Sequence, residues 1–108
     1  MTILHPLTVR PDQVHTSLAD HLLVDGFDLV LDLSASRGSR LVDARSGTSY
    51  LDLFSFFASS ALGMNHPAIA DDPRFTADLL EAARNKPSSS DVYTVAMADF
   101  VATFARVL

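Results

Sequence analysis

Histidine is the first residue type in this chain that could carry chemistry, because it binds metal ions and moves protons near neutral pH. The four histidines are His5, His15, His21 and His66, and no two have the His-x-x-x-His spacing that presents both rings on one helix face. The first lies in the N-terminal tail, the next two lie off the apolar stripe of a predicted helix, and the last lies in an Asn-His-Pro turn. We therefore predict no metal site.

Lysine offers a second kind of chemistry, since a desolvated amine can form a Schiff base with a carbonyl compound. Lys86 is the single lysine, and it stands between Asn85 and Pro87 where a predicted helix ends. A lysine at such an end interacts favourably with the last helix carbonyls, and it remains solvated. We therefore predict no covalent role for Lys86.

Acidic and hydroxyl side chains complete the candidates. Twelve aspartates stand against the single Glu81, and Asp43 and Asp52 flank a predicted hairpin whose backbone they can bond. The pair Ser59-Ser60 lacks the Gly-x-Ser-x-Gly context of a nucleophile elbow, and no glycine-rich phosphate loop occurs. The residues alone therefore predict no catalytic and no cofactor-binding group in this chain.

Composition limits the kind of protein that this is. The 108 residues suit one small domain, and the 48% apolar content is typical of a globular chain. The net charge of −5, without a basic cluster, argues against nucleic acid or an anionic membrane as partner. The sequence has no cysteine, no recognisable secretory signal and no apolar run long enough to cross a bilayer. We expect a cytoplasmic protein.

The N-terminal half contains periodicities of both kinds. Pro11 begins a predicted helix with Val14, Leu18 and Leu22 on one face, and alternating apolar residues predict a strand over 27–33. Two short strands at 41–42 and 50–51 flank a loop in which Gly47 supplies a positive φ. An extended segment is predicted to continue through 53–57 into the small residues 58–62 and end at Gly63.

The C-terminal part predicts two helices. Phe75, Leu79, Leu80 and Ala83 share the face of the first helix, which ends at 85–87, and residues 88–91 are candidate N-caps for the second. The second helix has a longer apolar face, made of Tyr93, Met97, Phe100, Val101, Phe104 and Leu108. No helix-stop signal follows that face, which predicts a portion of a longer protein. The predicted fold class is an α+β fragment: a helix, a small hairpin or meander, then helices.

Three segments together resemble the N-terminal part of class III pyridoxal-phosphate aminotransferases: Gly38 to Asp43, Gly47 to Asp52 and Leu62 to Pro67. That family opens with a hairpin of the form G-x-x-x-x-D … G-x-x-Y-L-D and continues to a G … H-P turn. Segments 24–33, 58–65 and 85–93 further resemble its lysine 6-aminotransferase branch. The 4-aminobutyrate branch is similar but more distant.

The resemblance implies the N-terminal part of a fold-type I enzyme whose α/β parent is a homodimer acting on an amino acid and a 2-oxo acid. It implies a small-domain helix, hairpin and connecting strand over about 11–67, and helices leading toward the pyridoxal-phosphate domain over 68–108. The family's cofactor-binding residues and Schiff-base lysine come later in the sequence. Phe57, with Phe56 and Ala58 beside it, corresponds to a substrate-pocket position, and 58–63 to a subunit contact.

Two other interpretations of the residues remain open. An aromatic pair such as Phe56 and Phe57 most often packs in a core, because burial of large rings is its usual role. The apolar face of the last predicted helix also suits a small interaction module that binds a partner without catalysing a reaction.

Overall fold

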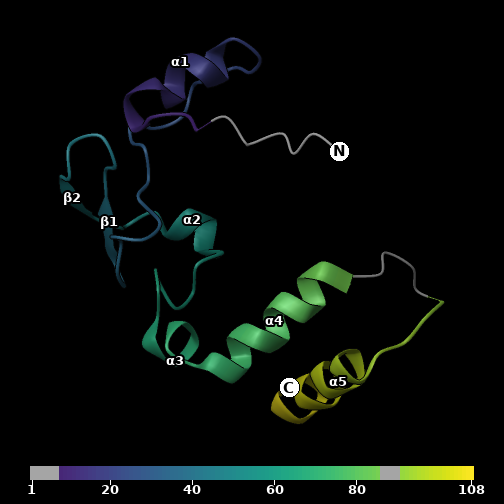
Figure 1. Cartoon of the computed structure of the whole chain (residues 1–108). Coiled ribbons are helices and arrows are strands. Elements are labelled where there is room, and N and C mark those ends of the chain that lie inside the picture. Colours follow the sequence, from purple (N-terminus) through teal and green to yellow (C-terminus); the bar gives the residue numbers. More distant parts are fainter. Residues whose placement is uncertain (1–7, 86–90) are drawn as a thin grey trace. The chain divides into compact units, whose positions relative to one another are not determined.

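A computed structural model describes residues 8–85 and 91–108, which divide into two compact units (Figure 1). The first unit extends to Asp72, and the second is Pro73–Leu108. The regular elements among the described residues are helices and one two-stranded sheet, as expected of an α+β fragment. Lys86 and the candidate N-caps Ser88 to Ser90 lie outside the described residues.

The N-terminal helix begins where the sequence predicts. A 3-10 turn, η1 (Pro11–Gln13), leads into α1 (Val14–Ala19), and Pro11 occupies an initial position where its missing N–H breaks no bond. The helix ends three residues before Leu22, whose N–H still bonds the Leu18 carbonyl at 2.8 Å. Val14 and Leu18 therefore share α1, whereas Leu22 lies beyond it.

The predicted strand over 27–33 is wrong. This segment makes only an isolated bridge between Leu31 and Asp43, with hydrogen bonds from Asp32 N to Val42 O (2.8 Å) and from Ala44 N to Val30 O (2.7 Å). Asp32 then turns the chain away, because its carboxylate accepts bonds from the next residues of the backbone. Apolar residues therefore alternate over 27–33, but the segment forms no continuous ladder of hydrogen bonds with a partner strand.

The hairpin is confirmed. Strands β1 (Arg40–Val42) and β2 (Ser49–Leu51) pair antiparallel, with Leu41 opposite Tyr50. Gly47 has a φ of 72°, and its N–H bonds the Asp43 carbonyl at 2.7 Å to close the loop. Leu41 is the one apolar side chain that is buried among the described residues, at 6% exposure. The inner face of β1 is thus the centre of a very small core.

The extended segment predicted over 53–57 is also wrong. After β2 the chain forms α2 (Ser55–Ala58), in which all four residues have positive φ. Aspartate hydrogen bonds and aromatic contacts, described below, hold the backbone in this turn. The small residues 58–62 lie in the turn and the loop after it, and they add no strand to the sheet.

A close backbone contact joins the loop before β1 to the loop after α2. Gly38 and Met64 exchange two hydrogen bonds, of 2.7 and 2.9 Å between N and O. A Cβ on Gly63 would lie 2.6 Å from the Gly38 carbonyl oxygen, and Gly63 has a φ of 72°. Asn65 Nδ2 adds bonds to the carbonyls of Leu33 (2.7 Å) and Ser36 (2.8 Å). The glycine is required here for both space and backbone angle.

The later helices start at side-chain or proline signals. His66 caps α3 (Pro67–Ala70) by accepting the Ala68 N–H at Nδ1 (3.2 Å), which confirms its role in a turn. The next helix, α4 (Pro73–Asn85), follows the Asp71-Asp72 pair and contains the predicted apolar positions Phe75, Leu79, Leu80 and Ala83. The last helix is α5 (Val95–Val107), and its N-cap is Thr94, whose hydroxyl accepts the Met97 N–H at 3.1 Å. Asp91 is therefore not its cap.

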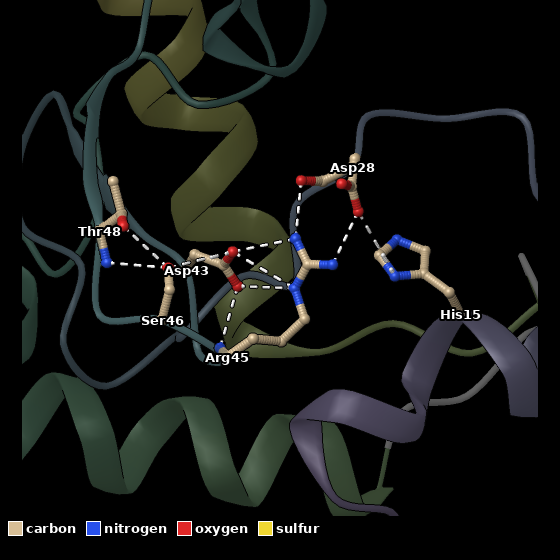
Figure 2. Close-up of polar contacts among 6 residues, drawn as sticks. All are labelled: His15, Asp28, Asp43, Arg45, Ser46 and Thr48. Carbon is tan, nitrogen blue, oxygen red and sulfur yellow. Dashed lines mark hydrogen bonds and ion pairs between the residues drawn. The ribbon is translucent and has the colours of Figure 1, made fainter.

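An arginine joins the hairpin loop to the segment before it (Figure 2). The Arg45 guanidinium contacts Asp43 at 3.0 Å and Asp28 at 2.7 Å, between nitrogen and oxygen. The Asp43 side chain is only 4% exposed and also accepts the Arg45 backbone N–H at 2.9 Å. These bonds lower the pKa of Asp43 to about 2, and they raise the pKa of Arg45.

Much apolar surface remains exposed on the helices of the second unit. On α4, Leu79 and Leu80 are about half exposed, and on α5 the stacked rings of Phe100 and Phe104 lie 5.9 Å apart between centroids. Within residues 8–85 and 91–108, no helix combines the length and apolar composition that crossing a membrane requires.

Our first prediction concerns the ionisation of Asp43. A pKa below its ordinary value of 3.8 means that the ionised carboxylate stabilises the fold above about pH 4, and that this contribution disappears as the pH falls toward 2. NMR titration of the Asp43 carboxyl carbon is expected to show a pKa of about 2. Arg45→Ala should raise it toward 3.8 because both the ion pair and the side-chain bonds are lost. Arg40→Ala, which removes the same charge from β1, should leave it unchanged.

Our second prediction concerns the close contact at Gly63. Gly63→Ala should accelerate amide exchange at Gly38 and Met64 by at least about tenfold, since the methyl group must displace backbone atoms. Gly47→Ala is the matched control, because Gly47 has the same φ of 72° but nothing within 4 Å of its ideal Cβ. Equal effects of both substitutions on these two amides would show that the backbone angle alone matters.

Our third prediction is that the 108-residue chain unfolds with little cooperativity. A core in which Leu41 is the buried apolar side chain cannot offset the conformational entropy of ordering the chain. Thermal melting followed by circular dichroism should give a broad transition, and sedimentation should detect association through the exposed helices. A sharp two-state melt of a monomer would instead favour the independent interaction module.

Candidate functional site

The end of β2 is shaped by the carboxylate of Asp52. Its Oδ1 accepts hydrogen bonds from the backbone N–H groups of Phe54 (2.9 Å) and Ser55 (2.7 Å). This arrangement is an Asx turn, in which a short side chain replaces the backbone carbonyl that would otherwise close the turn. The chain therefore leaves the strand direction directly after Leu51.

The backbone that follows is left-handed. Ser55, Phe56, Phe57 and Ala58 have φ values of 49°, 49°, 56° and 63°, and none of them is glycine. Left-handed helical backbone costs roughly 1–2 kcal/mol for each residue with a Cβ, so four residues store roughly 4–8 kcal/mol. Such strain persists only where the surroundings impose it, and it is concentrated at functional sites.

Polar and aromatic contacts impose this conformation. At the far end of the turn, the Ser59 hydroxyl donates to the Phe56 carbonyl at 2.7 Å. The ring of Phe54 lies 4.7 Å from that of Phe57 and 5.3 Å from that of Phe27, in edge-to-face geometry between centroids. Each aromatic pair contributes roughly 0.5–1.5 kcal/mol, which offsets part of the backbone cost.

The turn contains all three residues that the sequence suggests for a substrate pocket. Phe57 is 90% exposed, Phe56 is half-buried and Ala58 is exposed. In this chain the Phe57 ring has one edge-to-face neighbour and is otherwise open, so it is not part of the small core around Leu41. This exposure assigns no substrate contact, but it leaves an apolar ring open on a hydrogen-bonded turn.

Sequence reasoning missed what directs this ring. The sequence predicts that Asp52 bonds the backbone of the hairpin, but its carboxylate bonds the turn that follows. An aspartate two residues before a change of direction is a usable signal for an Asx turn. The left-handed run has no such signal, because glycine is its usual marker and none occurs between Gly47 and Gly63.

A second polar cluster lies on the first unit, and it is structural. His15 Nδ1 lies 4.0 Å from Asp28 Oδ1 beside an open depression lined by Thr16, Val24 and Phe27. Figure 2 shows Asp28 between the imidazole of His15 and the guanidinium of Arg45. The Asp28 carboxylate is engaged by the Arg45 guanidinium at 2.7 Å and is otherwise largely exposed, so this cluster does not indicate acid-base catalysis.

The described residues do not fit pyridoxal phosphate. They contain no lysine for a Schiff base, since Lys86 lies outside them. A depression lined by α4 and α5 residues carries Asp78, Glu81 and Asp99, whose negative charge would repel a phosphate. No group of three potential metal ligands occurs among residues 8–85 and 91–108. What the site can do chemically is to contact an apolar group through Phe57.

Comparisons with known proteins identify a longer relative. The chain is 65% identical over 98 residues to the L-lysine-epsilon aminotransferase of Mycobacterium tuberculosis, which covers 91% of this chain and 22% of that protein. The enzymes of that name from Amycolatopsis lactamdurans and Streptomyces clavuligerus are 64% and 61% identical over 88% and 93% of the chain. The chain thus spans about a fifth of the length of the curated relatives that it matches. No protein-family model matches it.

Solved structures agree with the sequence comparison. The lysine aminotransferase from M. tuberculosis in the internal aldimine form matches with a TM-score of 0.89 and 64% identity, over 93% of this chain and 23% of that one. A mutant of the M. tuberculosis protein matches equally well. The resemblance inferred from the hairpin and the G … H-P turn is therefore confirmed. Over most of its length the chain is thus similar to the L-lysine-epsilon aminotransferases, as expected of an N-terminal portion of such an enzyme.

Proposed function

We propose that this chain is part of a pyridoxal-phosphate-dependent enzyme that transfers the 6-amino group of L-lysine to 2-oxoglutarate. The products are L-glutamate and 2-aminoadipate semialdehyde, which cyclises with loss of water. The 65% identity to an L-lysine-epsilon aminotransferase over 91% of the chain carries this proposal. It also favours lysine over 4-aminobutyrate as the amino donor.

The chain's own part in this reaction is to form a wall of the substrate pocket, without a catalytic residue. Phe57 presents an exposed ring, with Phe56 and Ala58 in the same turn. The four-carbon stem of lysine is apolar, and each methylene group removed from water contributes about 0.8 kcal/mol. A rigid ring beside that stem would orient the amine toward a cofactor held by other parts of the enzyme.

The remaining roles follow from the same family relationship. We expect 11–67 to belong to the small domain, and 68–108 to lead toward the pyridoxal-phosphate domain. The small residues 58–63 are expected at a subunit contact of a homodimer, since small side chains permit close approach. A cytoplasmic location and the absence of nucleic-acid partners stay predictions from composition.

Our fourth prediction tests this function with a chimaera. The matched 98 residues of this chain would replace their counterpart in the M. tuberculosis enzyme. The purified chimaera, loaded with pyridoxal phosphate, should transaminate L-lysine with a kcat/KM within about tenfold of that enzyme, because the catalytic groups are untouched. The 108-residue chain alone, with added pyridoxal phosphate, should show no transamination.

The matched control carries the corresponding stretch from the Streptomyces clavuligerus relative, which is 61% identical to this chain. If that control is active on lysine while the chimaera folds, binds cofactor and prefers 4-aminobutyrate, the proposed amino donor is wrong. Transamination by the isolated chain would contradict the proposal that the catalytic groups lie in other parts of the enzyme.

A further inference from the structure

The left-handed turn at Ser55 to Ala58 needs neighbouring contacts that hold its backbone in place. Four consecutive residues, Ser55 to Ala58, keep positive φ without glycine, so a specific contact must prevent them from relaxing to a right-handed or extended form. The contact must act where the turn begins, because one backbone rotation there redirects every side chain that follows. Asp52 is the side chain at that place.

Asp52 acts on the backbone, not on the ring itself. Its Oδ1 receives the N–H groups of Phe54 and Ser55, at 2.9 and 2.7 Å, and these are the two residues that lead into the turn. Two N–H groups that donate to one carboxylate oxygen require the chain to fold back over that single side chain. The side chain is also partly buried, which limits competition from water.

The ring of Phe57 is oriented as a consequence. Phe54, bonded directly by Asp52, supplies the edge-to-face contact to Phe57 at 4.7 Å between centroids. The other surface of the Phe57 ring is open, at 90% exposure of the residue. Loss of the Asp52 bonds would free Phe54 and the backbone of Ser55 together, and so would release the ring from both of its supports.

We infer that Asp52 is a positioning residue for substrate recognition: it holds the left-handed turn that sets the Phe57 ring against the apolar stem of the amino donor. This inference rests on the proposed function for the identity of the donor. Asp52 touches neither substrate nor cofactor in this account. Its effect is to reduce the number of positions that the Phe57 ring can take before substrate arrives.

Our fifth prediction separates geometry from charge in the chimaera described above. Asp52→Ala should raise the KM for L-lysine about tenfold with little change in kcat, as expected when ground-state and transition-state binding weaken equally. Asp52→Asn keeps an oxygen at the same position and should restore the KM to within about threefold. Asp52→Glu keeps the charge on a longer side chain that cannot close the turn, so it should behave like the alanine variant. The control is Asp25→Ala, an exposed aspartate outside the turn.

Several outcomes overturn the inference. An unchanged KM in Asp52→Ala, with full cofactor content, shows that the turn does not position the ring. Loss of the dimer with kcat and KM changed together shows that the turn serves a subunit contact. If Asp52→Ala does not fold, Ser59→Ala weakens the other end of the turn, and an unchanged KM in that variant also overturns it.

Failure of the proposed function gives a different result. In that case the chimaera does not transaminate lysine, either with Asp52 or with any substitution at position 52. Crystal structures of that chimaera with Asp52 and with Asp52→Ala then decide the positioning role from the φ values at Ser55 to Ala58. Positive φ in both structures overturns the inference, and loss of positive φ only in the alanine variant supports it.

Discussion

Three aspartates of the first unit direct the chain that follows them. The carboxylate of each accepts hydrogen bonds from backbone N–H groups two or three residues further along the chain. Asp32 bonds the N–H groups of Ser34 and Ala35, each at 2.9 Å. Asp43 bonds that of Arg45 at 2.9 Å, and Asp52 begins the left-handed turn. Glutamate has one methylene group too many for this geometry. At these three positions, therefore, the structure favours aspartate over glutamate.

Hydrogen bonds in and beside these turns hold the first unit together where little apolar surface is buried. Ser36 is fully buried, and its hydroxyl donates to the Asp32 carbonyl at 2.6 Å and accepts the Val42 N–H at 2.9 Å. Polar groups in such positions must be satisfied, and each bond adds only about 0.5–1.5 kcal/mol of net stability. The unit is thus well specified in shape but weakly stabilised by burial. Apolar faces on α4 and α5 need a further surface to cover them, which in the proposed enzyme the rest of the polypeptide supplies.

The elements that sequence reasoning predicted correctly are those with local causes. Pro11 begins the N-terminal helix, and Gly47 defines the hairpin loop, because each acts through its own backbone preference. The strand predicted over 27–33 failed because the segment makes only an isolated bridge to Asp43, and a strand needs a continued ladder. Its alternation is real, but Asp32 turns the chain before a ladder can extend. Periodicity identifies a face, and it does not supply a partner strand.

The sequence identifies the residues of the candidate site, but it does not predict their backbone conformation. Phe56, Phe57 and Ala58 came from family resemblance, and intrinsic propensity places aromatic residues in strands. The strained turn overrides that preference because Asp52, Ser59 and the Phe54 ring act on the same four residues. An extended strand would alternate Phe56 and Phe57 between opposite faces of a sheet. The left-handed turn also gives the two adjacent phenylalanines different environments, because Phe57 is exposed and Phe56 is half-buried, but it does so without a partner strand.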